Sequence, residues 1–358
     1  MTITTDTVWF ARAEIGQASL DHFFGTDGLQ LLNNTYPSTP EANGTFNFWW
    51  LAHVVEVRLD AYERNGLQHG LDEAMRACQN IRDRNNGSLF NDYFDDMLWY
   101  GLAILRLYDA TGASSYLDEA VAIWEHVHEF GWNDHGGHSI AWRKQQLHYK
   151  NTPANGPFVI LSCRLAQRTS GPHYLQLAVS TFDWLTQNLV DARTGFVEDG
   201  INREADGRID THWRFTYNQG LYVGAAVELA RCTGDARYLI IAARTAVTAI
   251  EELSEGGVFR DEGDGGDEGL FKGIYYRYAG MLLHDLAPES EAASVIRDFI
   301  RISTDTLAHT SIRDGLLLAA NDWSTKPEGT VAYSTELSAI MALEVRARLE
   351  MRGFGSHR

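Results

Sequence analysis

Two neighbouring carboxylates, Asp95 and Asp96, are the residues whose type and spacing most directly suggest chemistry. They stand where a polar loop meets an apolar segment that ends near Gly112, so we expect them in the first turn of a helix. A helix N-terminus favours an ionised carboxylate, whereas apolar surroundings favour the neutral acid. Two acids whose pKa values are pushed apart can share general acid and base work at a glycosidic bond. Aspartates are also common capping residues, so the pair alone leaves both interpretations open.

The helices that would position this pair belong to a repeated pattern. An apolar helix end, a turn that contains glycine and a Leu-x-x-Ala helix start occur four times, and the leucines lie 46 to 64 residues apart. A period of this size with two helices per repeat indicates stacked helical hairpins. The turn glycines are each expected just after a helix C-terminus, in the left-handed conformation: Gly66, Gly112, Gly171 and Gly234.

Continuing this register predicts twelve helices that alternate between two kinds. Six amphipathic segments are expected to be outer helices: 8–24, 69–84, 115–129, 173–189, 236–253 and 289–307. Six segments that are apolar nearly all round are expected to be inner helices: 45–64, 92–110, 152–169, 213–232, 270–285 and 330–351. Six hairpins that close into a ring would make an all-α (α/α)6 barrel, a single catalytic domain over residues 1–358. An open solenoid is the alternative, although the sequence lacks polar capping repeats.

The long connections of the sequence all lead from an expected outer helix to the next inner one: 25–44, 130–151, 190–212, 254–269 and 308–329. Short hairpins could form at 194–197 and 257–260. Long loops in a compact domain are usually functional. One rim of the barrel should therefore carry a groove whose floor is made by the starts of the inner helices, the acid pair among them.

Polar and aromatic residues gather at these helix starts and in the loop 134–142. Amide, hydroxyl and ring groups in this mixture suit a hydroxyl-rich ligand. Capping or turn chemistry is the simpler explanation for any one of them, but six such starts on one rim favour a binding groove. The candidate binding residues are Trp49, Trp50, Tyr93, Gly136, Gly137, Trp142, Asn151, Asn155, Tyr217, Asn218, Gln219, Phe271, Lys272 and Tyr333.

Composition and charge exclude several classes of function. The formal net charge of −18 would repel phosphate backbones and anionic membrane surfaces, so neither nucleic acid nor a membrane is an expected partner. No run of about 18 apolar residues is present. The first residues lack the features of a signal peptide, and Cys78, Cys163 and Cys232 fit reduced core positions. We therefore expect a cytoplasmic monomer, or a secreted protein if the natural chain begins earlier.

Metal and cofactor motifs are weak in this sequence. The acidic loop 260–268 does not have the spacing of an EF-hand calcium loop. His135 and His138 lie three residues apart in a glycine-rich loop, which is a poor zinc signal. Neither a dinucleotide-binding nor a Walker motif is found. We expect no metal and no cofactor.

Several stretches resemble signatures of glycoside hydrolase family 76, the α-1,6-mannanases. They are YFDDMLW at 93–99, YNQG at 217–220, FKGI at 271–274, WWLAH at 49–53, the segment 151–157 and the loop 136–142. The likeness extends over about residues 8–350. It implies an (α/α)6 barrel and retaining hydrolysis of α-1,6-mannosidic linkages in mannan or manno-oligosaccharides. The resemblance leaves endo and exo cleavage open, because the choice depends on whether a loop blocks one end of the groove; we expect endo. It also implies Asp95 as nucleophile, Asp96 as general acid/base, and no metal.

The retaining mechanism constrains where the two acids can stand. It needs carboxyl groups about 5–5.5 Å apart, whereas neighbours on a regular helix point about 100° apart. Asp95 and Asp96 can therefore address one sugar only from a helix start.

Two other functions remain open. One is a sugar 2-epimerase on the same barrel, with His148, His212 or His284 as the base. The other is a glycan-binding protein without activity.

Overall fold

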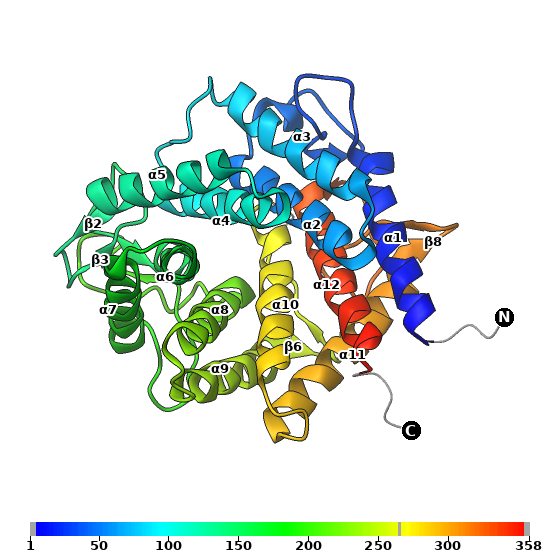
Figure 1. Cartoon of the computed structure of the whole chain (residues 1–358). Helices are drawn as coiled ribbons and strands as arrows, with labels where there is room; N and C mark the ends of the chain where they lie inside the picture. Colours follow the sequence, from blue (N-terminus) through cyan, green and yellow to red (C-terminus); the bar gives the residue numbers. More distant parts are fainter. Residues whose placement is uncertain (1–4, 264–265, 354–358) are drawn as a thin grey trace. The chain divides into compact units, whose positions relative to one another are not determined.

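The protein is seen in a computed structural model that describes residues 5–263 and 266–353. Twelve α-helices make up most of the described chain, which confirms the predicted all-α class. Every helix begins and ends within four residues of its predicted first and last residues. The helices are α1 (Thr5–Phe24), α2 (Phe48–Asn65), α3 (Gln68–Arg84), α4 (Phe94–Thr111), α5 (Ser114–Gly131), α6 (Thr152–Arg168), α7 (Pro172–Asn188), α8 (Thr216–Thr233), α9 (Arg237–Leu253), α10 (Glu268–Asp285), α11 (Glu291–Ser311) and α12 (Tyr333–Met351) (Figure 1).

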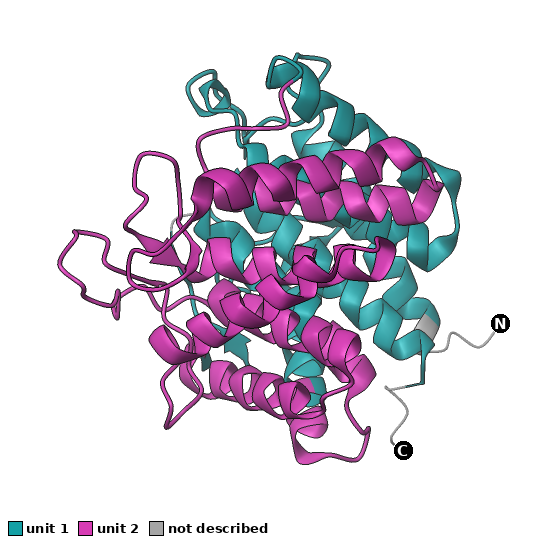
Figure 2. Cartoon of the chain, turned by 60° about the vertical axis from the view of Figure 1, so that its left-hand side comes forward, with its two compact units in different colours: residues 1–87, 254–280, 297–358 teal, residues 88–253, 281–296 magenta. Residues whose placement is uncertain are grey.

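The chain divides into two compact units (Figure 2). Unit 1 comprises residues 1–87, 254–280 and 297–358, and unit 2 comprises residues 88–253 and 281–296. Within unit 2, α4, α6 and α8 pack in succession, and each also packs against the helix that follows it, α5, α7 or α9. Within unit 1, α2 packs against α3 and α12, and α12 packs against α1. Each unit therefore has its own row of inner helices with outer helices against them.

Burial separates the two kinds of helix as their sequence patterns predict. In α8 every residue from Thr216 to Leu229 is buried, and in α12 nearly every residue is. In the outer helix α3 only one face is buried, formed by Leu71, Ala74, Ala77, Cys78 and Ile81. A helix that is apolar all round needs other helices on all sides, whereas an amphipathic one buries a single stripe. Among the described residues, no helix is both long enough and apolar enough to cross a membrane.

Three of the four predicted turn glycines end an inner helix. Gly66, Gly112 and Gly234 have φ of +69°, +71° and +73°, and each N–H donates to the carbonyl four residues earlier. Gly171 is different, and its prediction as a left-handed cap was wrong. It has φ −83° and ψ 102° and immediately precedes α7. Because Pro172 opens that helix with a fixed φ and no N–H, Gly171 takes an extended conformation, as residues before proline do.

The long connections lead from outer to inner helices, as predicted, and they hold all ten short strands of the described chain. The strands pair antiparallel: β1 (Thr35–Tyr36) with β10 (Val331–Ala332), β2 (Trp132–Asn133) with β3 (Ser139–Ile140), β4 (Lys150–Asn151) with β5 (Gly200–Ile201), β6 (Ser254–Glu255) with β7 (Val258–Phe259), and β8 (Ile312–Arg313) with β9 (Leu316–Leu317). The hairpin expected at 257–260 is β6–β7, and 194–197 contributes an isolated bridge between Val190 and Val197. These pairings fix the loops that carry the candidate site.

Candidate active site

The acid pair lies in the first turn of α4, where its sequence position predicted it. Phe94 is the first helical residue, so Asp95 and Asp96 are the second and third, and both are half-buried rather than sealed in the core. One oxygen of Asp95 accepts the Asp96 N–H at 3.0 Å, and the other accepts the Trp142 indole N–H at 3.0 Å. Both oxygens of Asp95 are therefore fixed by protein donors.

Asp96 is held from the loop that precedes the helix. The Asn91 side-chain amide donates to its Oδ2 at 2.9 Å, and the Asn91 oxygen accepts the Tyr93 N–H at 2.8 Å. Asn91 thus turns the chain into α4 and orients the second acid at the same time. Asn91 was not among the predicted site residues, although it stands in the same short segment as the pair.

The connection between α5 and α6 is fastened to the start of α4. The Phe94 N–H donates to the Trp142 carbonyl at 2.9 Å, and the Lys144 N–H donates to the Asp92 carbonyl at 3.0 Å. The Tyr93 and Trp142 rings meet edge to face at 5.5 Å. Trp142 therefore satisfies a helix N–H that has no partner within its own helix, and its indole reaches Asp95. Of the predicted binding residues, Trp142 donates a hydrogen bond to Asp95, and Tyr93 packs against Trp142.

A second carboxylate, Asp199, organises the residues around Tyr217. Asp199 is buried, and its Oδ1 accepts the Tyr217 hydroxyl at 2.9 Å and the Asn218 amide at 3.1 Å. Its Oδ2 lies 2.8 Å from the Tyr149 hydroxyl and 3.1 Å from the Arg203 guanidinium. Burial is the main cause that raises the pKa of Tyr217 well above its usual value; the Asp199 charge comes next, and the Asp95 charge acts in the same direction. Tyr217 is thus a neutral hydroxyl within the electrostatic reach of Asp95.

Three predicted binding residues have side chains committed to the protein backbone. The Asn151 side chain caps α6 by accepting the Ala154 N–H. The Asn155 side chain is fully buried and bonds both backbone groups of Ile140. Gln219 is also fully buried and bonds both backbone groups of Val197. These amides hold loops against inner helices, and the structure gives them no open face for a ligand.

The two glycines of the β2–β3 turn, Gly136 and Gly137, contribute their carbonyls to the scaffold. The Trp184 indole donates to the Gly136 carbonyl at 2.8 Å, and the buried Lys150 ammonium donates to the Gly137 carbonyl and, at 2.8 Å, to that of Asn133. Gly137 has φ +100°, and a Cβ there would come within 2.9 Å of the Trp184 ring. Burial lowers the pKa of Lys150 to about 8. The Lys150 ammonium therefore clamps the β2–β3 turn through two carbonyls. Gly137 occupies a position in this turn where any side chain would collide with the Trp184 ring.

Replacing this clamp should loosen the turn. Lys150→Met keeps the length of the side chain but leaves the Asn133 and Gly137 carbonyls without their donor. We expect a loss of about 1–3 kcal/mol in the free energy of unfolding, because unpaired buried acceptors cost roughly this much. Chemical denaturation measures the change. Lys144→Met, on the same connection, is the matched control and should cost less than about 0.5 kcal/mol; an equal loss in both variants would contradict the clamp.

Unit 1 holds the remaining predicted residues. The indoles of Trp49 and Trp50 both donate to Oδ1 of Asp267, at 2.9 and 2.7 Å. The Trp49 and Phe271 rings lie 6.4 Å apart, and the Trp50 and Tyr333 rings meet edge to face at 5.1 Å. Trp50, Phe271 and Tyr333 are buried, whereas Trp49 is half-exposed and is the ring best placed to meet a ligand. Asp267 is at the centre of this group, although the sequence indicates it only as part of the acidic loop 260–268. Residues 264 and 265 of that loop lie outside the described residues.

Two buried ionisable groups lie next to the start of α12. Lys272, a predicted binding residue, donates its ammonium to the Asn321 carbonyl, and burial lowers its pKa. Glu336 is fully buried, and its Oε2 accepts the Ala319 N–H at 3.0 Å, while its Oε1 has no hydrogen-bond partner. Burial raises the pKa of Glu336 to about 8. Both groups therefore hold the backbone of residues 319–321 by hydrogen bonds, Lys272 at the Asn321 carbonyl and Glu336 at the Ala319 N–H. With this raised pKa, Glu336 is a neutral acid at pH 7.

Glu336 should make stability depend on pH. An unfolded glutamate titrates near 4.5, and the folded one near 8. Between these values the unfolded chain has released a proton that the folded chain keeps, so stability falls as pH rises. Glu336→Gln cannot ionise and keeps an acceptor for Ala319. We expect it to match the wild type at pH 4 and to exceed it by up to about 4 kcal/mol at pH 8.

Denaturation at several pH values measures this difference. Glu344→Gln is a matched control on the same helix, because Glu344 is a buried carboxylate paired with Arg64 at 2.7 Å. That substitution should lower stability at pH 7, since it leaves a buried guanidinium without its counter-charge. A constant effect of Glu336→Gln from pH 4 to pH 8 would contradict the raised pKa of Glu336.

Comparison with known proteins identifies the class to which this fold and site belong. The family model described as glycosyl hydrolase family 76 matches residues 10–351. A solved protein of Listeria innocua is 48% identical over 98% of this chain and 99% of its own, with a TM-score of 0.93. An inactive variant of the α-1,6-mannanase GH76A of Salegentibacter sp. HEL1_6, with two aspartates replaced by asparagine, was solved with α-1,6-mannotriose. It is 33% identical over 95% of this chain and 99% of its own, with a TM-score of 0.88.

A further relative, whose name states an enzyme activity, comes from Schizosaccharomyces pombe. It is named as a candidate mannan endo-1,6-α-mannosidase and is 26% identical over 308 residues, which are 79% of this chain and 68% of that protein. The chain belongs to glycosyl hydrolase family 76. It is therefore a glycoside hydrolase with the (α/α)6-barrel fold of that family. The comparisons give no support to the epimerase alternative.

Proposed function

We propose that this glycoside hydrolase cleaves α-1,6-mannosidic linkages within mannan chains, with retention of configuration at the anomeric carbon. The observation that carries the proposal is the acid pair, Asp95 and Asp96, held by separate N–H donors at the start of α4. The sequence contains no other pair of consecutive aspartates. The inactive Salegentibacter mannanase variant lacks two aspartates, and its ligand is an α-1,6-linked mannotriose.

The proposed mechanism assigns one role to each acid. The Asp95 carboxylate attacks the anomeric carbon, while Asp96 gives its proton to the departing glycosidic oxygen, so that a mannosyl ester forms on Asp95. Asp96, now a carboxylate, takes a proton from water. The water oxygen then bonds to the same carbon and the ester breaks, which restores both groups. The hydrogen bonds from the Trp142 indole and the Asp96 N–H support the assignment of Asp95 as the nucleophile. They fix both oxygens of Asp95 before the substrate arrives.

Endo cleavage is the part of this proposal that rests on the curated relative, whose name gives an endo enzyme. Linear α-1,6-mannan should be cut to a ladder of oligosaccharides, and the anomeric proton signals of the first products should be those of the α form. Size separation and proton NMR measure the two properties. Mannose as the sole product would overturn endo action, the β form as the first product would overturn retention, and an untouched polymer would overturn the proposed substrate.

A further inference from the structure

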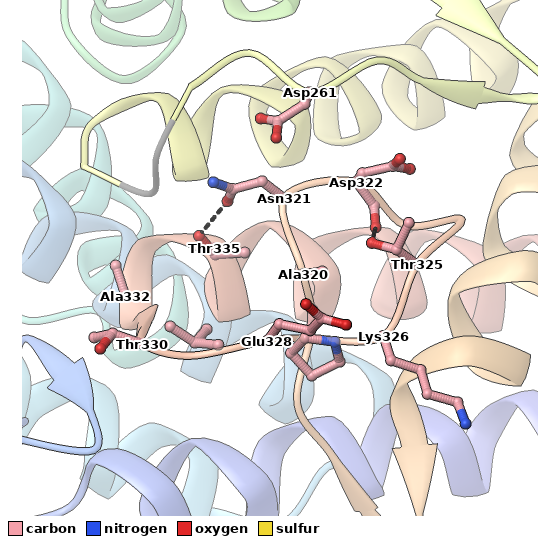
Figure 3. A pocket seen from close by; sticks show the side chains of 13 residues that line it. Asp261, Ala320, Asn321, Asp322, Thr325, Lys326, Glu328, Thr330, Ala332 and Thr335 are labelled. Carbon is pink, nitrogen blue, oxygen red and sulfur yellow. Dashed lines mark hydrogen bonds between the residues drawn. The ribbon is translucent and has the colours of Figure 1, made fainter.

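Unit 1 carries a polar trough that no residue of the acid pair lines. One pocket of about 500 Å³ is lined by Asp261, Thr335 and residues of the 319–332 connection (Figure 3). A second pocket of about 410 Å³ is lined by residues that include Asn47, Trp50 and Asp267. Both pockets are lined by Thr330 and Ala332. The two pockets therefore adjoin each other beside the first turn of α12, and we name them together the α12 trough.

The wall of the α12 trough is built in advance of any ligand. The Asn321 side chain donates to the Gly263 carbonyl and accepts the Thr335 hydroxyl at 2.7 Å (Figure 3), and its backbone carbonyl accepts the buried Lys272 ammonium. The neighbouring Ala319 N–H is held by the buried Glu336. A wall whose groups are already fixed loses little conformational entropy when a ligand binds, so it can recognise one at low cost.

The lining defines the chemical class of ligand. Carboxylates of Asp261, Asp322 and Glu328 and the hydroxyls of Thr325 and Thr330 are hydrogen-bonding partners for sugar hydroxyls. Small apolar residues of the same pocket can meet the C–H face of a pyranose ring: Ala319, Ala320, Pro327 and Val331. Three carboxylates against one lysine disfavour an anionic ligand. Among the described residues no three Asp, Glu, His or Cys side chains come together as a metal site, so a neutral hydroxyl-rich ligand fits best.

We propose that the α12 trough binds consecutive mannose units of a linear α-1,6-mannan, through groups other than the acid pair. The identity of the sugar rests on the proposed function, whereas the existence of a carbohydrate site rests on the trough itself. Two adjoining pockets suit two or more linked sugar units better than one. The expected consequence is tighter binding of longer chains.

Methyl NMR of the threonines in the trough tests this directly. The double variant D95N/D96N is titrated with α-1,6-mannotetraose, so that binding is observed without turnover. We expect the methyl signals of Thr325, Thr330 and Thr335 to shift in a saturable way. Thr330→Trp should abolish the shifts of the other two, because the exposed Thr330 borders both pockets and an indole there would fill them.

The matched control is Thr26→Trp, the same exchange in a separate pocket of about 390 Å³ on unit 1. It should leave the threonine shifts unchanged. Threonine signals that stay in place at millimolar mannotetraose would overturn the trough, and so would equal shifts in the Thr330→Trp variant. The wild type also gives an independent answer on mannan. If it fails to cleave mannan while the trough threonines shift, the proposed function falls and the carbohydrate site stands. If it cleaves mannan and the threonine methyl signals do not shift, the proposed function stands and the carbohydrate site in the α12 trough falls.

Discussion

Asp95→Asn and Asp96→Asn should each lower kcat on α-1,6-mannan by at least about 10²-fold while the protein stays folded. Asp95→Asn removes the atom that would bond to the anomeric carbon, and Asp96→Asn removes the proton for the leaving oxygen, a contribution of about 10²–10⁴ on its own. Asparagine offers one acceptor where Asp95 uses two, so a local cost of about 1 kcal/mol in stability is expected as well. Initial rates and thermal unfolding measure the two effects separately.

The two roles can be told apart with a substrate whose leaving group needs no proton. An aryl α-1,6-mannobioside should still form the mannosyl ester on the Asp96→Asn variant, and added azide should then release an α-mannosyl azide. The Asp95→Asn variant can form no ester, and any azide product should have the β configuration. Interchanged results would reverse the assigned roles.

Asp92→Asn is the matched control for this experiment. Asp92 is exposed, lies three residues before Asp95, and contributes its backbone carbonyl to the contact with Lys144. The substitution leaves that carbonyl in place, so activity should stay within about twofold of the wild type. Near-normal activity in either acid variant would remove that residue from the mechanism, and a large loss in Asp92→Asn would show that the whole segment is sensitive to substitution.

The sequence predicted the helices and the position of the acid pair because both depend on local patterns. Inner and outer helices differ in how many of their faces are apolar, and this difference is visible in the residues themselves. Four of the six inner helices were predicted to start two or three residues early, for example at 92 for α4, which begins at Phe94. Polar residues before a helix belong to its cap or loop, and they carry no periodic signal that separates them from the first turn.

The residues that support the site were harder to find because their partners are distant in sequence. Asp199 meets Tyr149 and Tyr217, which are 50 and 18 residues away, and Asp267 meets Trp49 218 residues away. No spacing rule joins such groups; only the fold does. Conversely, Asn155 and Gln219 were expected in the groove because they are polar residues at helix starts. The buried backbone groups of Ile140 and Val197 need partners as well, and those amides supply them.

Asp199 lies outside the acid pair and holds two tyrosines, one packed against Trp142 and one within the electrostatic reach of Asp95. The Tyr149 ring meets Trp142 edge to face at 5.7 Å, and the Trp142 indole bonds to Asp95. Asp199 holds the Tyr149 hydroxyl on one oxygen and the Tyr217 hydroxyl on the other. It therefore fixes, through two separate residues, the surroundings of the proposed nucleophile. We regard Asp199 as a positioning residue.

Asp199→Ala should lower the free energy of unfolding by about 2–4 kcal/mol, because it removes the acceptor of the buried Tyr217 hydroxyl and Asn218 amide, whereas the Tyr149 hydroxyl and the Arg203 guanidinium keep Asp210 as a partner. Asp206→Ala, an exposed aspartate of the same connection, is the control and should cost less than about 1 kcal/mol. Chemical denaturation measures both changes. A loss of similar size in the two variants would contradict the central place of Asp199.

Stability alone does not separate a positioning role from a purely structural one, and kinetics on milder variants does. Tyr149→Phe and Tyr217→Phe each remove one hydroxyl from Asp199 and leave the rings in place. If Asp199 acts by orienting Trp142 and Asp95, each variant should lower kcat several-fold with little change in KM, because transition-state contacts would be misplaced while binding contacts remain. Unchanged kcat in both variants, with only stability affected, would reduce Asp199 to a structural residue. A rise in KM alone would instead place the tyrosines in substrate binding.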